Sequence, residues 1–397
     1  MNILVLGSGL MGYAAAFDLA RSPGVTRVTL ADQDAKTLES ARSRIAEATG
    51  RAIDTVRVEL PEDPTLPELL ARHDACLSAV PYFFNAALAR AAVGARTHFC
   101  DLGGNNTVVA EELALDADAR RGGVRIIPDC GLAPGMVNVV AARAVELLGE
   151  GVVDHLRIRV GGLPAHPEPP LDYALFFSVH GLINEYIEPC LVLRDGETFT
   201  VDGLSETEEI EFAPPFGKME AFQTSGGAST MPHSFRGRVR NLDYKTIRYP
   251  GHARQVRLLF DLGLGSTEPV ALADGSTVAP RKLLTRLLET HLPPPGEDVI
   301  LVRVEAEAGR DGATRRYRAE LLCRPDRFGR SAMMRTTADP ASVIAQMMVR
   351  GETGEPGAAT PERAVPPGIF LRHLAERDLD LRETLDGQPL TLPDDRA

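Results

Sequence analysis

The sequence has few cysteines, no long apolar run and too few basic residues to balance its acidic ones, and each shortage excludes a class of protein. Its five cysteines are widely spaced and form no C-x-x-C pair, so neither a disulfide framework nor a zinc site is indicated and free buried thiols are expected. No apolar stretch approaches the roughly 20 residues that cross a bilayer. The net charge of −12 argues against binding to nucleic acid or to an anionic membrane, because both need a basic surface.

The length and composition are those of a large protein with substantial cores. A chain of 397 residues, 44% hydrophobic and 25% charged, predicts two domains. The first apolar run has no basic leader and no small-residue cleavage site, so we expect a strand there and not a secretory signal. A cytoplasmic protein is therefore expected, and no metal site is predicted.

The most informative motif is a glycine-rich loop near the start of the chain. It lies between an apolar run, 1–6, and an alanine-rich helical stretch, 13–21, which gives the order strand, turn, helix. In such a unit the first glycine permits the tight turn, the second lets the backbone approach a pyrophosphate, and the third lets the helix pack closely on the strand. Free N–H groups at the helix start then bind the diphosphate of a dinucleotide. The loop residues are Gly7, Ser8, Gly9, Leu10, Met11 and Gly12.

A second apolar run, 25–31, ends in Asp32, twenty positions after Gly12. A carboxylate at this distance accepts hydrogen bonds from the ribose hydroxyls. Because Asp32 would repel a 2′-phosphate and the next residue is the neutral Gln33, the sequence favours NAD over NADP as the cofactor. Nearby Lys36 and Arg27 leave NADP as the alternative, and a purely structural copy of the motif is another.

The first 130 residues alternate short apolar runs with helical patterns, which predicts an α/β fold with a doubly wound parallel sheet, the Rossmann fold. The later strands are expected at 55–59, 75–80, 97–100 and 124–127, and the helices at 35–48, 65–72, 83–93 and 108–121. Ligands of such sheets bind beyond the carboxyl ends of the strands. We therefore expect three segments to face the cofactor, namely Ala79, Val80, Pro81 and Tyr82, then 101–104, then 129–131.

After Gly135 the pattern changes to a second, mixed α+β domain. A helix to about 148 leads into alternating strand-like runs, and the runs 299–307 and 314–323 predict a β-hairpin. Further strands are expected at 153–160, 189–194, 198–202 and 208–212, and helices at 251–262, 281–291 and 340–350. The predicted domains are an NAD-binding domain, 1–130, a substrate and dimerisation domain with antiparallel sheet, 131–340, and a C-terminal helical segment, 341–397, that packs back on the first domain.

These features and four further short motifs together resemble the saccharopine dehydrogenase-like family. The motifs are Cys-Gly-Leu-Ala-Pro-Gly at 130–135, Gly-Gly-Leu-Pro at 161–164, Thr-Ser-Gly-Gly at 224–227 and Arg-Tyr-Pro-Gly-His at 248–252. The resemblance implies a Rossmann domain paired with a mixed α/β domain and an oxidoreductase that breaks or forms C–N bonds with a nicotinamide cofactor. It also implies a homodimer, because the family is commonly dimeric.

Within the family the sequence is most similar to lysine 6-dehydrogenases, which have Gly-Gly-Leu-Pro, a proline-rich loop and a segment like 178–189. Saccharopine reductases carry an acidic residue where this chain has Ala133, which weakens that interpretation, and carboxynorspermidine dehydrogenases share the motif at 130–135. The resemblance therefore implies oxidative deamination of L-lysine at its ε-carbon to allysine, which cyclises to a piperideine carboxylate. The two relatives and a cofactor-binding sensor without catalysis are the alternatives.

Lysine oxidation requires particular side chains. The ammonium has a pKa near ~10.4, so a carboxylate or imidazole must help to remove its proton before hydride can leave. Asp101 is the first candidate to hold the ammonium, with His252 or His180 to relay the proton. For Asp101, a cap on the loop after Gly103 is an equal alternative.

The other end of the substrate calls for a different group. An α-carboxylate favours a planar, permanently charged donor, and Arg248 fits that role. Tyr82 is expected to hydrogen-bond the substrate or to stack beside the nicotinamide. Cys130 is expected to be a small wall near the nicotinamide and not a nucleophile, since no covalent step is needed.

Overall fold

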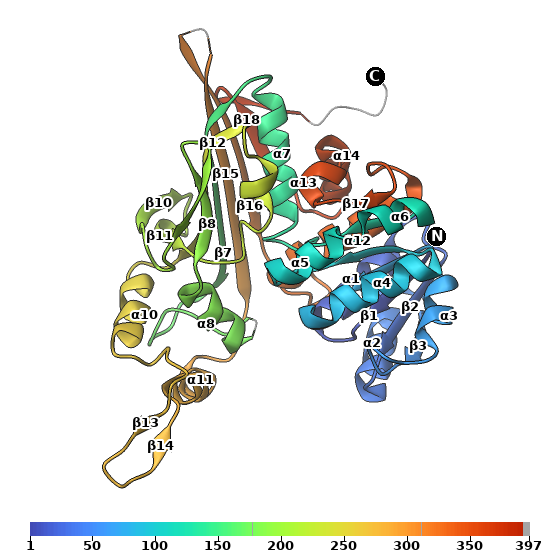
Figure 1. Cartoon of the computed structure of the whole chain (residues 1–397), viewed down its shortest axis with the longest axis horizontal. Helices are drawn as coiled ribbons and strands as arrows, with labels where there is room; N and C mark the ends of the chain where they lie inside the picture. Colours follow the sequence, from blue (N-terminus) through green and yellow to red (C-terminus); the bar gives the residue numbers. More distant parts are fainter. Residues whose placement is uncertain (177, 311, 392–397) are drawn as a thin grey trace.

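The computed structural model describes residues 1–176, 178–310 and 312–391, and two sheets dominate it (Figure 1). A seven-stranded parallel sheet forms the N-terminal domain, and a ten-stranded mixed sheet forms the second domain beside it. These two layers confirm the expected fold class. Among the described helices, none is long and apolar enough to cross a membrane.

The N-terminal sheet has the strand order β17-β6-β5-β4-β1-β2-β3, with helices on both faces. Its first strand is apolar and fully buried from Ile3 to Leu6, as a central strand of a parallel sheet requires. The strands are β1 (Asn2–Leu6), β2 (Arg27–Asp32), β3 (Asp54–Arg57), β4 (Ala75–Ser78), β5 (His98–Asp101), β6 (Arg125–Ile127) and β17 (Gly357–Ala358). The helices are α1 (Leu10–Arg21), α2 (Ala35–Thr49), α3 (Leu66–Ala71), η1 (Tyr82–Phe84), α4 (Asn85–Ala95), α5 (Asn106–Leu113) and α6 (Asp116–Gly122).

Two features of this sheet differ from the sequence prediction. The helix expected at 108–121 is two helices, α5 and α6, with the break at Ala114 and Leu115. The first of them starts earlier than expected because Asn105 caps it by accepting from the N–H groups of Thr107 and Val108. The seventh strand, β17, comes from the far end of the chain and pairs with β6. A strand of two residues leaves no periodic pattern, so it could not be predicted from the sequence.

The second sheet is mostly antiparallel, with one parallel pair between β12 and β7. The expected hairpin is confirmed as β15 and β16, in register from Ile300 opposite Cys323 to Arg310 opposite Ala313. The strands are β7 (Val153–Pro164), β8 (Cys190–Arg194), β9 (Glu197–Val201), β10 (Glu208–Phe212), β11 (Gly217–Gln223), β12 (Val239–Arg248), β15 (Asp298–Arg310), β16 (Ala313–Cys323), β18 (Arg382–Leu385) and β19 (Gln388–Pro389), with β13 (Val270–Ala271) and β14 (Thr277–Val278) apart. The helices are α7 (Met136–Leu147), α8 (Val179–Ile187), α9 (Met231–Ser234), α10 (His252–Asp261), α11 (Pro280–His291), α12 (Ala332–Arg350), α13 (Pro361–Ala364) and α14 (Pro367–Ala375).

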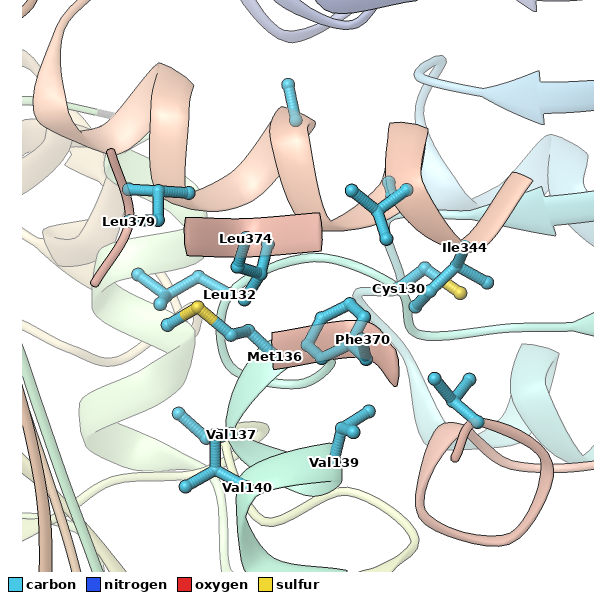
Figure 2. Close-up of a cluster of buried hydrophobic side chains, with 14 of the residues drawn as sticks. Cys130, Leu132, Met136, Val137, Val139, Val140, Ile344, Phe370, Leu374 and Leu379 are labelled. Atoms are coloured by element: carbon cyan, nitrogen blue, oxygen red, sulfur yellow. The ribbon is translucent and has the colours of Figure 1, made fainter. Parts of the chain in front are cut away.

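Helix α12 lies between the two domains and starts earlier than expected. Ser331 caps it by accepting from the N–H of Met334, and Pro340, read from the sequence as a helix start, lies inside the helix. The boundary expected between residues 340 and 341 therefore falls within one continuous helix. Figure 2 shows the apolar contact that results, with Ile344 of α12 beside Cys130 and with Phe370 and Met136 packed below.

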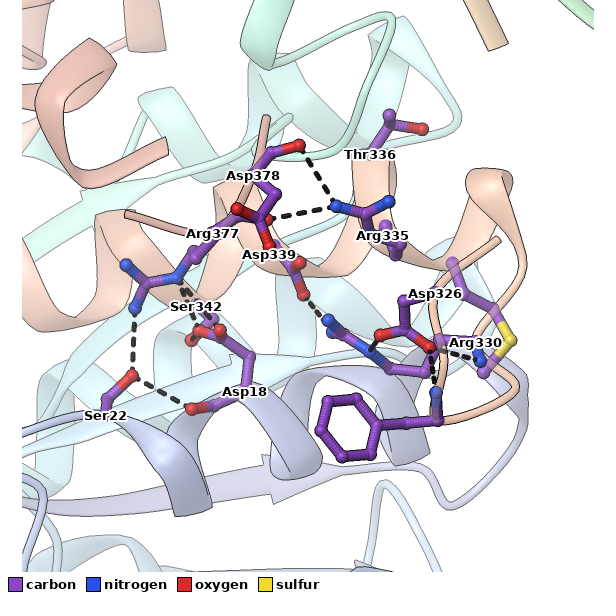
Figure 3. Close-up of polar contacts among 12 residues, drawn as sticks. Asp18, Ser22, Asp326, Arg330, Arg335, Thr336, Asp339, Ser342, Arg377 and Asp378 are labelled. Atoms are coloured by element: carbon purple, nitrogen blue, oxygen red, sulfur yellow. Dashed lines mark hydrogen bonds and ion pairs between the residues drawn. The ribbon is translucent and has the colours of Figure 1, made fainter. Parts of the chain in front are cut away.

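A polar network joins α1 to α12 and to the chain beyond α14 (Figure 3). Arg377 donates to both carboxylate oxygens of Asp18 at 2.9 Å, and Ser342 donates to the same carboxylate at 2.6 Å. Arg330 pairs with Asp326 at 2.8 Å and with the buried Asp339. These bonds fix α12, whose first turns face the second domain, against the first helix of the Rossmann domain.

Candidate active site

The glycine loop has the geometry that close approach by a ligand needs. Gly7 has a φ of +94°, and a Cβ there would lie 2.8 Å from the carbonyl oxygen of Ala79. A Cβ on Gly12 would lie 1.8 Å from the carbonyl oxygen of Gly7, whereas a Cβ on Gly9 would meet nothing within 4 Å. The first and third glycines are therefore required by packing, and the second faces open space in front of the helix.

The start of α1 is free to bind an anion. Gly9 is its N-cap residue and no side chain caps the first turn, and the following Leu10 is 63% exposed. Val80 lies against the loop, with Cγ1 3.1 Å from the position of a Cβ on Gly7, and Ala79 donates its N–H to Leu6. The residues predicted to bind the cofactor, Ser8, Met11 and Pro81 among them, thus lie at one edge of the sheet, and they fit a dinucleotide.

Asp32 at the end of β2 lies directly beside this loop. Its two oxygens accept from the N–H groups of Ser8 at 2.6 Å and Asp34 at 3.0 Å. Burial works to raise the pKa of Asp32, but the hydrogen bonds from Asp34 and Ser8 outweigh it and hold the pKa below its ordinary value. The carboxylate is therefore ionised where a ribose would lie.

Two adjacent cavities lie between the domains, beyond the carboxyl ends of β5 and β6. The first, of about 170 Å³, contains Arg248 and is called the arginine cavity; the second, of about 160 Å³, contains Asp129 and Glu188 and is called the acidic cavity. Pro134 and Tyr244 line both. The arginine cavity is completed by Leu102, Leu132, Ala133, Val160, Gly162, Glu185, Thr246, Met333 and Thr337.

Arg248, the last residue of β12, is fixed by two hydrogen bonds and an aromatic contact, and among the described residues its third nitrogen, Nη2, has no partner. Its Nε donates to the hydroxyl of Tyr186 at 3.1 Å and its Nη1 to the carbonyl of Ile247 at 3.0 Å, while its guanidinium lies 4.7 Å from the ring centre of Tyr173. Among the described residues, none accepts a hydrogen bond from Nη2. This buried cation can therefore take a carboxylate in the arginine cavity.

His252 does not have the expected role. It is 2% exposed and lines neither interdomain cavity, and its Nδ1 and Nε2 lie 3.0 Å from the carbonyl of Leu171 and from the hydroxyl of Tyr186. Burial, and then the charge of Arg248, lowers its pKa to about 3. The prediction of a proton relay is wrong, because both ring nitrogens are used and the imidazole stays neutral; His252 instead orients the tyrosine that holds Arg248.

His180 and Asp101 also fail to meet a substrate. His180 lies in the first turn of α8, exposed and outside both cavities. Asp101 is completely buried, and its Oδ1 accepts from the N–H groups of Gly103 at 2.6 Å and Asp129 at 3.2 Å. Of the two alternatives for Asp101, the loop cap is correct and the ammonium ligand is not, because the carboxylate is closed off from the cavities by the loops that it fixes.

Glu112 of α5 is the neighbour that keeps Asp101 in place. It is completely buried, and its pKa is raised to about 11 by burial and by the charge of Asp101, with which it shares a hydrogen bond. The Glu112 carboxyl is therefore protonated at neutral pH and donates to Asp101. An acidic residue in a helix is usually exposed, so this role could not be predicted from the sequence.

Cys130 and Tyr82 flank the site without lining either cavity. The thiol of Cys130 is fully buried and donates to the carbonyl of Ile127 at 3.1 Å, and Figure 2 shows it in the apolar core. The expectation of a wall beside the nicotinamide is wrong for Cys130, because the loop turns its small, apolar thiol inward. The other four cysteines are also free and buried, as expected. Tyr82 is 40% exposed, with its Cδ1 3.4 Å from the position of a Cβ on Gly104.

Glu185 is the functional candidate that the sequence analysis missed. It lies on α8, next to Tyr186, and lines the arginine cavity together with Arg248. Burial raises its pKa to about 7, with Arg248 acting to lower it and the nearby Glu188 to raise it. The available signal was its place in the segment 178–189, which the family resemblance singled out only as a whole.

Two family models match the chain, one over each domain. The family model of the saccharopine dehydrogenase NADP binding domain matches residues 3–127, and that of the saccharopine dehydrogenase C-terminal domain matches residues 131–379. The chain is 27% identical over 277 residues to the NADP(+)-dependent, L-glutamate-forming saccharopine dehydrogenase of Pyricularia oryzae, a match that covers 67% of this chain and only 58% of that relative. It is 25% identical over 422 residues to the carboxynorspermidine synthase of Vibrio cholerae, which covers 98% and 99% of the two chains.

A solved structure shows the same fold. Apo saccharopine dehydrogenase (L-Glu forming) from Saccharomyces cerevisiae superposes with a TM-score of 0.78 at 18% identity, over 97% of this chain and 99% of that one. Because the two family models together span nearly the whole chain, the match does not depend on one domain. The chain belongs to the saccharopine dehydrogenase family.

Proposed function

We propose that the protein is a nicotinamide-dependent oxidoreductase that breaks or forms a C–N bond in an amine-bearing amino acid. The observation that carries this proposal is that Arg248 and Glu185 line the same cavity, beside the loops of the dinucleotide-binding domain. The guanidinium supplies a carboxylate site, and the carboxyl group supplies a base. A bound nicotinamide would take up hydride from the carbon next to the nitrogen.

The charges that line the cavities support a substrate with one carboxylate. Among the described lining residues, Arg248 is the one basic side chain, whereas Asp129, Glu185 and Glu188 are acidic. Saccharopine carries three carboxylates, and two of them would face this acidic surface without a cation. The charge balance therefore favours an amino acid whose other groups are amines.

Glu185 is suited to remove the proton that blocks oxidation. A substrate ammonium has a pKa near ~10.4, and a carboxyl whose own pKa is raised toward neutrality is a better base than an ordinary glutamate. The pKa of Glu185 is raised to about 7 by burial. Once ionised, Glu185 accepts the ammonium proton while Arg248 holds the carboxylate, and the free lone pair on nitrogen then permits hydride to leave the adjacent carbon.

L-Lysine is the simplest substrate with these groups, and its oxidation at the ε-carbon balances. Lysine, NAD⁺ and water give allysine, ammonium, NADH and a proton. The second candidate is an enzyme that joins an amine to an amino-acid aldehyde, and the full-length match to carboxynorspermidine synthase favours it. Both candidates use the same two residues, so substrate and direction must be separated by assay.

We propose NAD as the preferred cofactor. Asp32 is ionised at the ribose position, and the loop after β3 next to it carries Glu59, Glu62 and Asp63. The neighbouring Arg57 pairs with Glu59 at 2.9 Å, which partly offsets its positive charge. A 2′-phosphate would therefore meet several carboxylates, which supports NAD even though the matching family domain is described as NADP binding.

Initial rates with both cofactors and several substrates test these proposals. Oxidation is followed with L-lysine and with saccharopine by the absorbance of the reduced nicotinamide, and reduction is followed with an amino-acid aldehyde plus glutamate or a diamine. We expect turnover with substrates that carry one carboxylate and a higher kcat/KM with NAD than with NADP. Tight NADH binding without turnover of any amine would instead indicate a sensor.

A further inference from the structure

The acidic cavity contains hydrogen-bond acceptors for which the protein supplies no donor. Gln223, at the end of β11, lines this cavity and is completely buried. Its Nε2 donates to Glu206 at 2.8 Å, but among the described residues no donor reaches its Oε1. A buried amide oxygen without a donor is unfavourable in free energy, so its presence at a cavity wall indicates a ligand that donates.

The charge around Gln223 fits a cation. Asp129 and Glu188 line the same cavity from opposite domains, and among the described lining residues none is lysine or arginine. Burial raises the pKa of Asp129 to about 8, and an ammonium bound beside this carboxyl would favour its ionised form. Ser225 donates to Glu188 at 3.4 Å, and Ser229 donates to Asp129, so hydroxyl groups orient both carboxyls. Within the described chain no group of three or more His, Cys, Asp or Glu residues is placed to hold a metal. An organic ammonium, with several N–H donors, is therefore the cation that this cavity fits.

We propose that the acidic cavity binds a primary ammonium on an aminoalkyl arm of the substrate. This inference rests on the proposed function and deepens it, because the substrate is then a secondary amine whose carboxylate lies on Arg248 and whose arm reaches Gln223. The two cavities meet at Pro134 and Tyr244, so one molecule passing between them can occupy both. A volume of about 160 Å³ exceeds that of one water, roughly 30 Å³, several times and leaves room for a short alkyl chain.

The corresponding reaction balances. A secondary amine R–CH₂–NH₂⁺–R′, NAD⁺ and water give R–CHO, R′–NH₃⁺, NADH and a proton. The C–N bond breaks after hydride has left the adjacent carbon, and the amine that leaves is the one held in the acidic cavity. In the reverse direction the same cavity presents a diamine to an aldehyde whose carboxylate is bound by Arg248.

The test uses the full chain and calorimetric binding of putrescine, with butanediol as its uncharged analogue and glutarate as an anionic one. We expect putrescine to bind, butanediol not to bind, and glutarate not to displace putrescine, because Arg248 in the arginine cavity is the site that can hold a carboxylate. Glu188→Gln and Gln223→Met should each weaken putrescine by at least about fivefold. Glu150→Gln is the matched control, since Glu150 is exposed and outside both cavities, and it should leave putrescine binding unchanged. Thermal melting of each variant shows whether it is folded.

The outcomes separate this inference from the proposed function. If lysine is oxidised normally but putrescine binding is absent, or is unchanged in folded Glu188→Gln and Gln223→Met, the acidic cavity is not an amine site and the proposed function stands. If putrescine binds with the expected losses but no amine or aldehyde is turned over, the site is correct and the proposed oxidoreductase function is wrong. Binding of glutarate at the same site would overturn the charge argument.

Discussion

Replacing Glu185 with glutamine should change the shape of the pH profile for oxidation. In the unmodified protein, burial raises the pKa of Glu185 to about 7, so kcat/KM should rise about tenfold per pH unit below that value and level off above it. The plateau arises because ionised Glu185 removes the proton from a substrate that binds as its ammonium ion. Without this base, only the amine that is already free can react.

The size of the effect follows from the fraction of the substrate amine that is unprotonated at each pH. At about pH 8, an amine with a pKa near ~10.4 is free in only about 1 molecule in 250, so Glu185→Gln should lower kcat/KM by about two orders of magnitude. The deficit should shrink about tenfold per pH unit and nearly vanish by about pH 10, because the free amine becomes abundant. The measurement is the initial rate of NADH formation with L-lysine, or with the preferred substrate, across this range.

The neighbouring Glu188 provides the matched variant. Its negative charge contributes to the raised pKa of Glu185, so with L-lysine, which has no second amine arm, Glu188→Gln should move the lower limb of the profile to lower pH and keep the plateau. A plateau above neutrality that persists in Glu185→Gln would refute the assignment of Glu185 as the base. A uniform loss at every pH, with no change in shape, would show that the residue acts only in binding.

Three further variants test the carboxylate site, the cofactor site and the buried acids. Arg248→Ala should raise the KM for L-lysine by at least about tenfold but that for cadaverine, which lacks the carboxylate, far less; equal effects would remove Arg248 from the carboxylate site. Asp32→Ala should weaken NAD by about tenfold or more in a titration and leave NADP less affected, whereas unchanged NAD affinity would place the ribose elsewhere. Because the folded-state pKa of Glu112 is raised to about 11, folding favours its protonated form, and the stability that it contributes is lost as pH rises above its ordinary value of 4.5. Glu112→Gln, which can still donate to Asp101, should therefore raise Tm by about 2 °C or more near pH 8 and by less near pH 5; no pH dependence of this gain would contradict a protonated Glu112.

The local parts of the fold could be predicted because their signals are local. The alternation of apolar runs with helical patterns predicted the Rossmann sheet, and the alternating runs at 299–307 and 314–323 predicted the hairpin. The short strand β17 and the early start of α12 could not be predicted, because a pairing with a strand over 200 residues away and a serine cap are decided by contacts made elsewhere.

In the candidate site too, one residue was predicted from the sequence and others were not. Arg248 was identified because one side-chain type suits a carboxylate so well, and the structure places it in the cavity. His252, Asp101 and Cys130 were equally plausible by type, but each is turned into the protein interior by the hydrogen bonds that it makes. Glu185 was missed because its altered pKa is a property of its surroundings.

The sequence by itself determined the dinucleotide-binding loop, since Gly7, Gly12 and Asp32 belong to one strand-turn-helix-strand unit and their spacing carries the geometry. The tertiary structure alone decided which polar groups face the substrate. Arg248, Glu185 and Gln223 come from three separate elements of the second domain and line the two cavities between the domains. Whether such a group is a ligand, a base or a structural support depends on its burial and its partners, which exist only once the chain has folded.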